Sequence, residues 1–360
     1  WEAAERPEAE LLAVMKHVRF TVMAEEFLRG TVGAWPALDS KEAQRVLFNA
    51  MLPLAGSTKP VPRLGFGPRV YLVGGHNGRK LRTVELYDPE NASWKQLASM
   101  VYPRSNHCCV ALSGKLYAVG GAASAEQVLG GKGPEFLVLD TAEVYDPQTD
   151  GWQPLAKMTT ARHVFGLAAV DGKIYAIGGR HGNSTLESVE AYNPQLGSWA
   201  LVASMSVQRM DHTSVVLDGK IYSIGGYGDG HRLDTVEVYD PRADSWQRVA
   251  SMPRAVYSHA ATTMSGKIYV TGGNDKGSMK SVCVYDPQAD AWTQLAGMST
   301  GRRGHASAAV GGKLYVFGGR AYADGKGRLD TAEVYDPTSD SWAQVTNLTS
   351  VRSSMVAVVL

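Results

Sequence analysis

The sequence predicts an all-β fold: a six-bladed β-propeller closed by the C-terminal strand. A unit with a glycine pair, a tyrosine and a tryptophan occurs six times, at a nearly constant period. The two ends of the repeat region also supply complementary parts of one unit. The glycine pairs begin at Gly74, Gly120, Gly178, Gly225, Gly272 and Gly318.

The period of the units indicates their architecture. Successive glycine pairs are 46, 58, 47, 47 and 46 residues apart, and each tyrosine precedes its tryptophan by seven residues, as Tyr87 precedes Trp94. A period in the forties is typical of radial arrays of four-stranded blades. The one long interval predicts an insertion in the second unit, at about 122–139. Its Gly-rich, apolar sequence fits either a flexible loop or part of a docking surface.

Each unit divides into four strands. In the third unit we expect them at 163–170, 173–179, 186–194 and 198–203. Asp-Gly at Asp171 and Asp218, and Ser-Gly at Ser113 and Ser265, predict tight hairpins between the first two strands. Glycine pairs within strands mark places where a bulky group approaches the backbone, and we expect that group to be the tryptophan of the repeat.

The chain ends predict how the ring closes. The first unit begins at its second strand, at Arg69, whereas Ser353–Leu360 forms a first strand with nothing after it. We therefore expect the last strand to complete the first blade, and the propeller to span residues 69–360.

The first part of the chain has a helical pattern instead. Leu11, Leu12, Met15 and Val18 recur at helical intervals, and Ser40 is placed to cap a second helix. We expect an α-helical segment at 1–55 and a Pro- and Gly-rich linker at 56–68. Because the chain opens at Trp1 in the middle of such a pattern, we expect a preceding portion to be missing.

Composition limits the function classes. The formal net charge of +1 argues against a nucleic acid or a membrane surface as main partner. Neither a run of 18 apolar residues nor a signal peptide occurs, so the expected compartment is cytosol or nucleus. Cys108, Cys109 and Cys283 provide neither a disulfide framework nor a zinc site. No cofactor is expected.

A comparison between units predicts buried ion pairs. An arginine follows the Met of each unit (Leu348 in the last) by four residues, and a glutamate precedes each tyrosine by two. The exceptions, Val256 and Cys283, fall in the same blade. We therefore expect each arginine to pair with the glutamate of its blade as part of the scaffold. The arginines are Arg104, Arg162, Arg209, Arg302 and Arg352, and the glutamates are Glu85, Glu143, Glu190, Glu237 and Glu333.

The combination of Gly-Gly, Tyr-Asp-Pro, Trp and Met-x-x-x-Arg over about residues 66–360 resembles the Kelch repeat. The helical opening resembles the C-terminal part of a BACK domain. Together they resemble the C-terminal part of a BTB-BACK-Kelch protein. That resemblance implies a non-catalytic substrate adaptor of cullin-3 ubiquitin ligases, with a cytoplasmic location and nuclear or cytoskeletal locations as alternatives. Cullin-3 binding and homodimerisation would belong to the BTB and early BACK parts of the intact protein, which we expect to be missing here.

The resemblance also places client contacts in the loops around the channel. Candidate positions directly follow the glycine pair or the scaffold arginine, and they differ from unit to unit. Several arginines suggest an acidic client, and two tyrosines suggest aromatic anchors. The candidates are His76, Asn77, Ser105, Asn106, His163, Arg180, His181, Met210, Asp211, Tyr227, Arg232, Tyr257, Ser258, Asn274, Arg303, Arg320, Ser353 and Ser354.

Other interpretations of the function also fit the sequence. Four histidines recur at one repeat position, which favours packing over a metal site: His107, His212, His259 and His305. Kelch folds also include enzymes and cytoskeletal, actin-associated proteins. Against an enzyme stands the lack of a distinctive catalytic constellation in the repeats.

Overall fold

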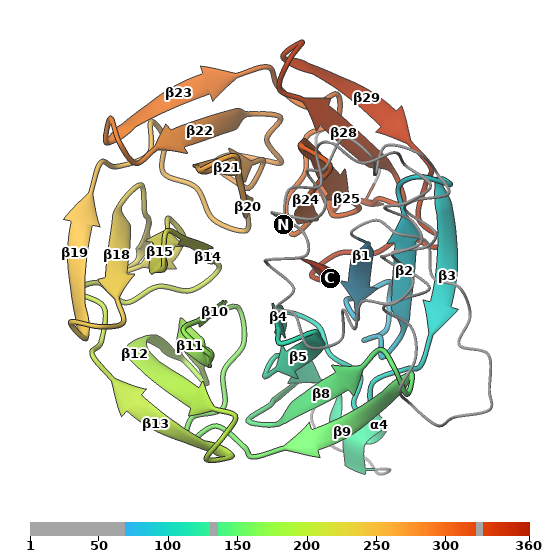
Figure 1. The fold of residues 1–360 in the computed structure, drawn as a ribbon, viewed down its shortest axis with the longest axis vertical. Coiled ribbons are helices and arrows are strands. Elements are labelled where there is room, and N and C mark those ends of the chain that lie inside the picture. The colour runs from blue at the N-terminus through green and yellow to red at the C-terminus, as the bar shows by residue number, and fades with distance from the viewer. Residues whose placement is uncertain (1–68, 130–135, 322–326) are drawn as a thin grey trace, which may run out of the picture. The chain divides into compact units, whose positions relative to one another are not determined.

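The computed structural model describes residues 69–129, 136–321 and 327–360. In this part of the chain, six antiparallel four-stranded sheets are arranged radially around a central channel (Figure 1). The propeller predicted from the repeat period is therefore confirmed. The helices expected at 1–55 and the linker at 56–68 lie outside the described residues.

The strands of each blade run from the channel to the outer edge. Blade 1 contains β30 (Val356–Val359), β1 (Val70–Val73), β2 (Val84–Asp88) and β3 (Ser93–Leu97). Blade 2 contains β4 (Cys108–Leu112), β5 (Lys115–Val119), β8 (Ala142–Asp146) and β9 (Gly151–Leu155). Blade 3 contains β10 (Gly166–Val170), β11 (Lys173–His181), β12 (Ser184–Asn193) and β13 (Ser198–Val202).

The remaining blades repeat the pattern. Blade 4 contains β14 (Thr213–Leu217), β15 (Lys220–Ile224), β18 (Val236–Asp240) and β19 (Ser245–Val249). Blade 5 contains β20 (Ala260–Met264), β21 (Lys267–Thr271), β22 (Val282–Asp286) and β23 (Ala291–Leu295). Blade 6 contains β24 (Ala306–Val310), β25 (Lys313–Phe317), β28 (Ala332–Asp336) and β29 (Ser341–Val345).

Short elements occur in the loops that join the second and third strands of three blades. Two-stranded ribbons are formed by β6 (Ala122–Ala123) with β7 (Leu137–Val138), by β16 (Tyr227–Gly228) with β17 (His231–Arg232), and by β26 (Arg320–Ala321) with β27 (Gly327–Arg328). The blade 2 insertion also contains a short helix, α4 (Ala125–Leu129). Among the described residues, no helix has the length and apolar character needed to cross a membrane.

The predicted hairpins form between the first two strands of the blades. Asp171 and Gly172 have φ values of 50° and 72°, as the tight turn between β10 and β11 requires. Asp218 and Ser113 adopt the same left-handed conformation. The Asp-Gly and Ser-Gly pairs therefore set the strand register as the sequence predicts.

The repeated tyrosine and tryptophan join neighbouring blades. Tyr239 and Trp246 lie opposite each other in blade 4, and their ring centroids are 5.0 Å apart. Trp246 Nε1 donates to the Ala203 carbonyl of blade 3 at 2.9 Å. Asp244, in the turn between β18 and β19, accepts from the Tyr239 hydroxyl at 2.6 Å and from the Ala203 amide at 2.9 Å. We call this set of contacts the turn clasp; Asp150, Asp290 and Asp340 repeat it.

The prediction that the tryptophan approaches the glycine pair is wrong. A Cβ on Gly120 would lie 2.6 Å from the Arg162 carbonyl oxygen and 2.9 Å from Phe165. A Cβ on Gly121 would lie 2.5 Å from the His107 Cβ. The tryptophans instead lie on the outermost strands, where they contact the adjacent blade. The glycines therefore make room for the recurring histidine position.

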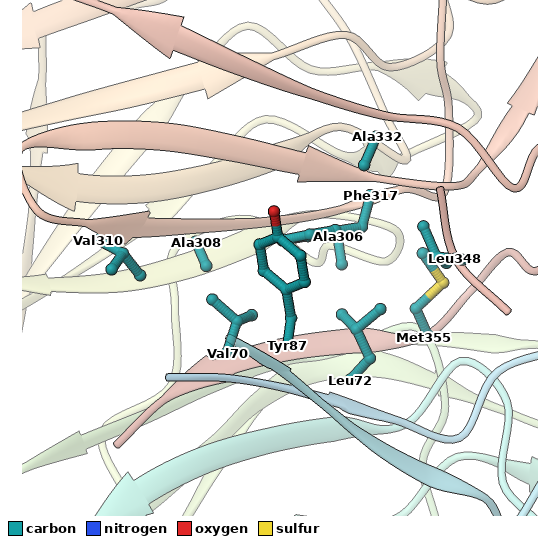
Figure 2. Packing of buried hydrophobic residues seen from close by; sticks show 10 residues of the cluster. All are labelled: Val70, Leu72, Tyr87, Ala306, Ala308, Val310, Phe317, Ala332, Leu348 and Met355. Atoms are coloured by element: carbon teal, nitrogen blue, oxygen red, sulfur yellow. The ribbon is translucent and has the colours of Figure 1, made fainter. Parts of the chain in front are cut away.

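The C-terminal strand closes the ring as predicted. Strand β30 is the innermost strand of blade 1 and pairs antiparallel with β1, with Val70 opposite Val359. Figure 2 shows the packing at the junction of blades 6 and 1, where Tyr87 lies against Phe317. Their ring centroids are 5.7 Å apart. Met355, next to β30, belongs to the same cluster, so the end of the chain contributes to this junction.

All five predicted arginine–glutamate pairs are present. Their closest N–O distances are 2.5 to 2.8 Å, and the side chains are at most 5% exposed. The backbone of Arg209 bonds Leu186 and Gly179 of blade 3, while its guanidinium reaches Glu237 in blade 4. Each such arginine therefore connects two neighbouring blades, through its backbone to one and through its side chain to the other. In blade 5 the side chains of Val256 and Cys283 stand at these positions.

Candidate protein-binding face

The two sets of predicted loop positions meet in pairs. The residue after the glycine pair and the residue after the scaffold arginine (after Val256 in blade 5) form an antiparallel backbone bridge in every blade, with N–O distances of 2.8 to 3.4 Å. This geometry brings side chains from separate loops together at the channel mouth. The pairs are His76 with Ser353, Ser105 with Ala122, His163 with Arg180, Met210 with Tyr227, Tyr257 with Asn274, and Arg303 with Arg320.

The next residue in each blade belongs to a closed ring of backbone hydrogen bonds around the channel. Each amide donates to the carbonyl of the preceding blade at 2.7 to 3.1 Å, and the ring closes from Asn106 back to Ser354. All six residues have φ values between 48° and 55°. We call it the mouth ring; its members are Asn106, Val164, Asp211, Ser258, Gly304 and Ser354.

The residue types of the mouth ring fit its backbone conformation. Glycine, asparagine and aspartate tolerate left-handed φ values, whereas a β-branched residue there is strained. Val164 is the β-branched member, with φ of 48°. Four of these positions are among the candidates predicted from the sequence, but the residue pattern does not indicate that their backbones form a ring. The recurrence of Asn, Asp, Ser and Gly at one position was the available signal.

One side of the face is aromatic. The rings of Tyr227 and Tyr257 lie edge to face with centroids 6.0 Å apart, across the junction of blades 4 and 5. The Tyr257 hydroxyl accepts a hydrogen bond from Asn274 Nδ2, and the Tyr227 hydroxyl donates to the Gly230 carbonyl at 2.7 Å. The two predicted anchors therefore form one platform, held in place by their own loops.

The opposite side of the face is cationic. The Arg328 guanidinium lies 2.7 Å from His76 Nδ1, and Arg320 Nε donates to the Ser353 hydroxyl at 3.2 Å. Partial burial, followed by the positive charges of Arg328, Arg320 and Lys80, lowers the pKa of His76. The histidine is therefore neutral at physiological pH, and the field around it is positive. Lys80 and Arg328 are not among the candidates predicted from the sequence.

A hollow of about 820 Å³ lies at this cationic side. It is lined by His76, Lys80, Asn106, Phe136 and Arg320, among others. Phe136, from the blade 2 insertion, is 48% exposed and lies edge to face against His163 of blade 3. Lys80 Nζ lies 5.1 Å above the same ring. The described end of the insertion thus contributes an apolar surface to the hollow.

The other arginines of the face contact their own surroundings. Arg180 donates to the Gly182 carbonyl at 2.9 Å, and Arg232 lies 3.4 Å from the Asp275 carboxylate of the next blade. His181 and Asn77 are exposed. Any ligand carboxylate would therefore compete with Asp275 for Arg232.

Several candidate side chains are buried. Ser105, His163, Asn274 and Ser353 are each less than 9% exposed, so these positions offer little side-chain surface. Asp211 is the acidic member of the mouth ring and accepts from the Ser258 hydroxyl at 3.1 Å. Burial raises its pKa, against the opposing effects of the Ser258 bond and of Arg303 and Arg180.

The recurring histidines pack between blades. Burial lowers the pKa of His107 and His305 to about 3 and that of His259 to about 4, and holds the pKa of His212 well below its ordinary value. The imidazoles are neutral and line the channel of about 480 Å³ together with the innermost strands. Within the described ranges, no three His, Cys, Asp or Glu side chains form a group that could hold a metal ion. Burial also raises the pKa of Cys108 to about 12, which makes its thiol unreactive.

Comparison with known proteins agrees with the observed fold. The KLHDC2/KLHL20/DRC7 Kelch-repeats domain matches residues 64–251 and 212–359. Kelch-like ECH-associated protein 1A of Danio rerio is 31% identical over 188 residues, which are 51% of this chain and 30% of that protein. Kelch-like ECH-associated protein 1B of the same fish is 36% identical over 126 residues, 35% of this chain and 19% of that protein.

Further matches extend this agreement. Human Kelch-like protein 28 is 34% identical over 191 residues, 49% of this chain and 32% of that protein. The matched regions thus span less than a third of each of these relatives. The solved structure of YjhT has a TM-score of 0.62 and 19% identity, and covers 73% of this chain and 89% of that one, which supports the fold alone. From the matched repeats and the observed propeller, the chain belongs to the Kelch-repeat family.

Proposed function

We propose that the propeller binds a client protein at the channel mouth, through an acidic segment of that client. The face around the mouth ring, with Arg180, Arg303 and Arg320 on paired loops, carries this proposal. Arginine binds carboxylates through two parallel hydrogen bonds, and a rigid backbone ring limits the entropy lost when a ligand binds. The Tyr227–Tyr257 platform would contact an apolar part of the same segment.

We further propose that the intact protein acts as a non-catalytic substrate adaptor of a cullin-3 ubiquitin ligase. Support comes from the similarity to Kelch-like proteins and from the BACK-like helical pattern of residues 1–55. Cullin-3 would bind a BTB and BACK portion that also makes the protein a homodimer. Residues 56–68 would link that portion to the propeller, and the adaptor would act in the cytoplasm.

A peptide selection tests the binding proposal. Random peptides displayed on phage are selected on the 360-residue chain and on the variant Arg180→Glu/Arg303→Glu/Arg320→Glu. We expect Asp- and Glu-rich sequences to be enriched on the wild-type chain and lost on the variant, with binding that weakens as salt increases. Arg248, on the outer strand β19, supplies the control substitution Arg248→Glu, which should leave the selection unchanged. Enrichment of the same peptides on the triple variant would contradict the proposal.

A further inference from the structure

Blade 5 differs from the other blades at three linked positions. Val256 replaces the scaffold arginine and Cys283 replaces its glutamate. The third position follows the methionine of the repeat. In blades 2, 3, 4 and 6 its backbone amide donates to the glutamate, at 2.7 to 2.8 Å. In blade 5 it is Pro253, which has no amide hydrogen to donate. The arginine, the glutamate and the amide that donates to the glutamate have therefore changed together.

A cavity of about 300 Å³ lies at this place. Its walls include Val256, Val270, Gly272, Ser281 and Cys283. The loop backbone has kept its position, because Val256 still donates to the Leu233 carbonyl and accepts from the Gly226 amide as the arginines do in their blades. The cavity therefore results from the shorter side chains and not from a displaced loop.

The polar wall of this cavity contains the two backbone carbonyls that accept hydrogen bonds from an arginine NH₂ group in other blades. In blades 2, 3, 4 and 6, arginine Nη1 donates to two carbonyls at 2.7 to 3.0 Å. These belong to the first glycine of the pair and to the residue two before the glutamate. In blade 5 the same two positions are Gly272 and Ser281, and the Gly272 amide donates to the Ser281 carbonyl at 2.9 Å. Both carbonyl oxygens are thus positioned to accept hydrogen bonds from a planar NH₂ donor.

The charge of the cavity selects the kind of donor. Among the described residues that line it, Arg254 at the rim is the charged one. Cys283 is a neutral thiol, because burial raises its pKa to about 12. A buried guanidinium would have no carboxylate partner here, which is strongly unfavourable. A neutral donor avoids that penalty, and Val256, Val270 and Met252 would contact its apolar part.

We propose that the blade 5 cavity binds a small neutral molecule with a planar NH₂ donor, such as a primary carboxamide, attached to an apolar group. Its NH₂ group would take the place that arginine Nη1 has in the other blades.

Saturation-transfer NMR on the 360-residue chain tests this site with benzamide as probe. We expect a dissociation constant on the order of 1 mM. Acetophenone has a methyl group in place of the NH₂ group, and benzamidinium has a positive charge; each should bind at least about tenfold more weakly, through the lost hydrogen bonds or the buried charge. Equal binding of acetophenone would overturn the proposal, and so would stronger binding of benzamidinium or no binding of benzamide.

Three variants test where the site lies. Val256→Arg/Cys283→Glu rebuilds the ion pair and should abolish benzamide binding. Cys283→Met fills the cavity without adding a charge and should also abolish benzamide binding. This variant keeps the test available if the first variant does not fold. Conversely, Arg209→Val/Glu237→Cys should open a second cavity, beside Gly225 and Thr235, and double the number of binding sites. Unchanged binding in folded Cys283→Met would contradict the assignment to blade 5.

Discussion

At the residue scale, the ion pairs show why a single sequence contains structural information usually sought in alignments. Removing one partner of a buried pair leaves an uncompensated charge, whereas replacing both is often tolerated. The joint change at Val256 and Cys283 therefore predicted the five pairs that the structure confirms. Pro253 is a third change linked to the loss of the pair. It was not predicted, because the hydrogen bond that it removes comes from a backbone amide and not from a side chain.

The pair in blade 4 allows a direct stability test. We expect Arg209→Val to lower the free energy of unfolding by about 3 to 5 kcal/mol, because Glu237 stays buried without its partner. The double variant Arg209→Val/Glu237→Cys, which copies blade 5, should lose less than the single variant. Urea denaturation measures both. If the double variant loses the sum of the losses measured separately for Arg209→Val and Glu237→Cys, the two residues are not coupled.

The buried histidines predict a pH dependence. Burial lowers the pKa of His259 to about 4, so the folded protein keeps it neutral while the unfolded chain binds a proton below about pH 6.5. The stabilisation that the neutral His259 gives the folded state is complete above pH 6.5 and decreases as the pH falls toward 4. Between pH 7 and pH 5 the free energy of unfolding should decrease by about 2 kcal/mol through His259.

His259→Phe should reduce this pH dependence, since blade 3 has Phe165 at the same position. Urea denaturation of the wild type and the variant at a series of pH values between 5 and 8 provides the comparison. Because each protein serves as its own reference at pH 8, a general stability change does not affect the result. Identical slopes for the two proteins would show that His259 takes up no proton on unfolding in this range.

At the scale of elements, the strands were predictable because their determinants are local. The Asp-Gly turns, the Tyr-to-Trp spacing and the glycine pairs fixed the strand order and most boundaries. The mouth ring was not predictable to the same extent, because it depends on left-handed backbone conformations repeated in six separate loops, one of them at Val164. The tryptophan prediction failed because the tryptophan lies on the outermost strand, whereas the glycine pair faces the loop that carries the recurring histidine.

The turn clasp provides a test at this scale. We expect Asp244→Ala to lower the free energy of unfolding by about 1 to 3 kcal/mol, because the Ala203 amide and the Tyr239 hydroxyl lose their acceptor. Asp244→Asn retains an acceptor and tolerates the φ of 45°, so it should lose less. Thermal or urea unfolding compares the two. Because asparagine keeps both an acceptor and the turn conformation, equal losses in the two variants would contradict this account of the clasp.

At the scale of the whole molecule, closure depends on a strand from the far end of the chain. Removing residues 355–360 should expose the inner edge of β1 and destabilise blade 1, because β30 supplies its channel-side strand. Size-exclusion chromatography should then show association, and unfolding should begin at lower urea. Val358→Asp provides a milder version, since Val358 of β30 is 7% exposed and packs in the core cluster between blades 1 and 2. Unchanged stability in both variants would mean that β30 is dispensable for closure.

The sequence predicted the ring, its closure and the loops that meet at the channel mouth, because each follows from repeat spacing and strand order. It did not predict the separation of that face into an aromatic and a cationic side. That division depends on Lys80 and Arg328, which lie outside the two compared loop positions and reach the face only through the folded loops.

Hydrogen exchange of the 360-residue chain with a selected acidic peptide tests the central claim most directly. Exposed loop amides at 77–79, 181–184 and 229–232 lie on the proposed face, and the turns at 171–172, 218–219 and 265–266 join the first two strands at the other ends of the blades. If the channel mouth binds the client, the peptide slows exchange in the first set and leaves the second unchanged. Slower exchange confined to the second set would contradict the account.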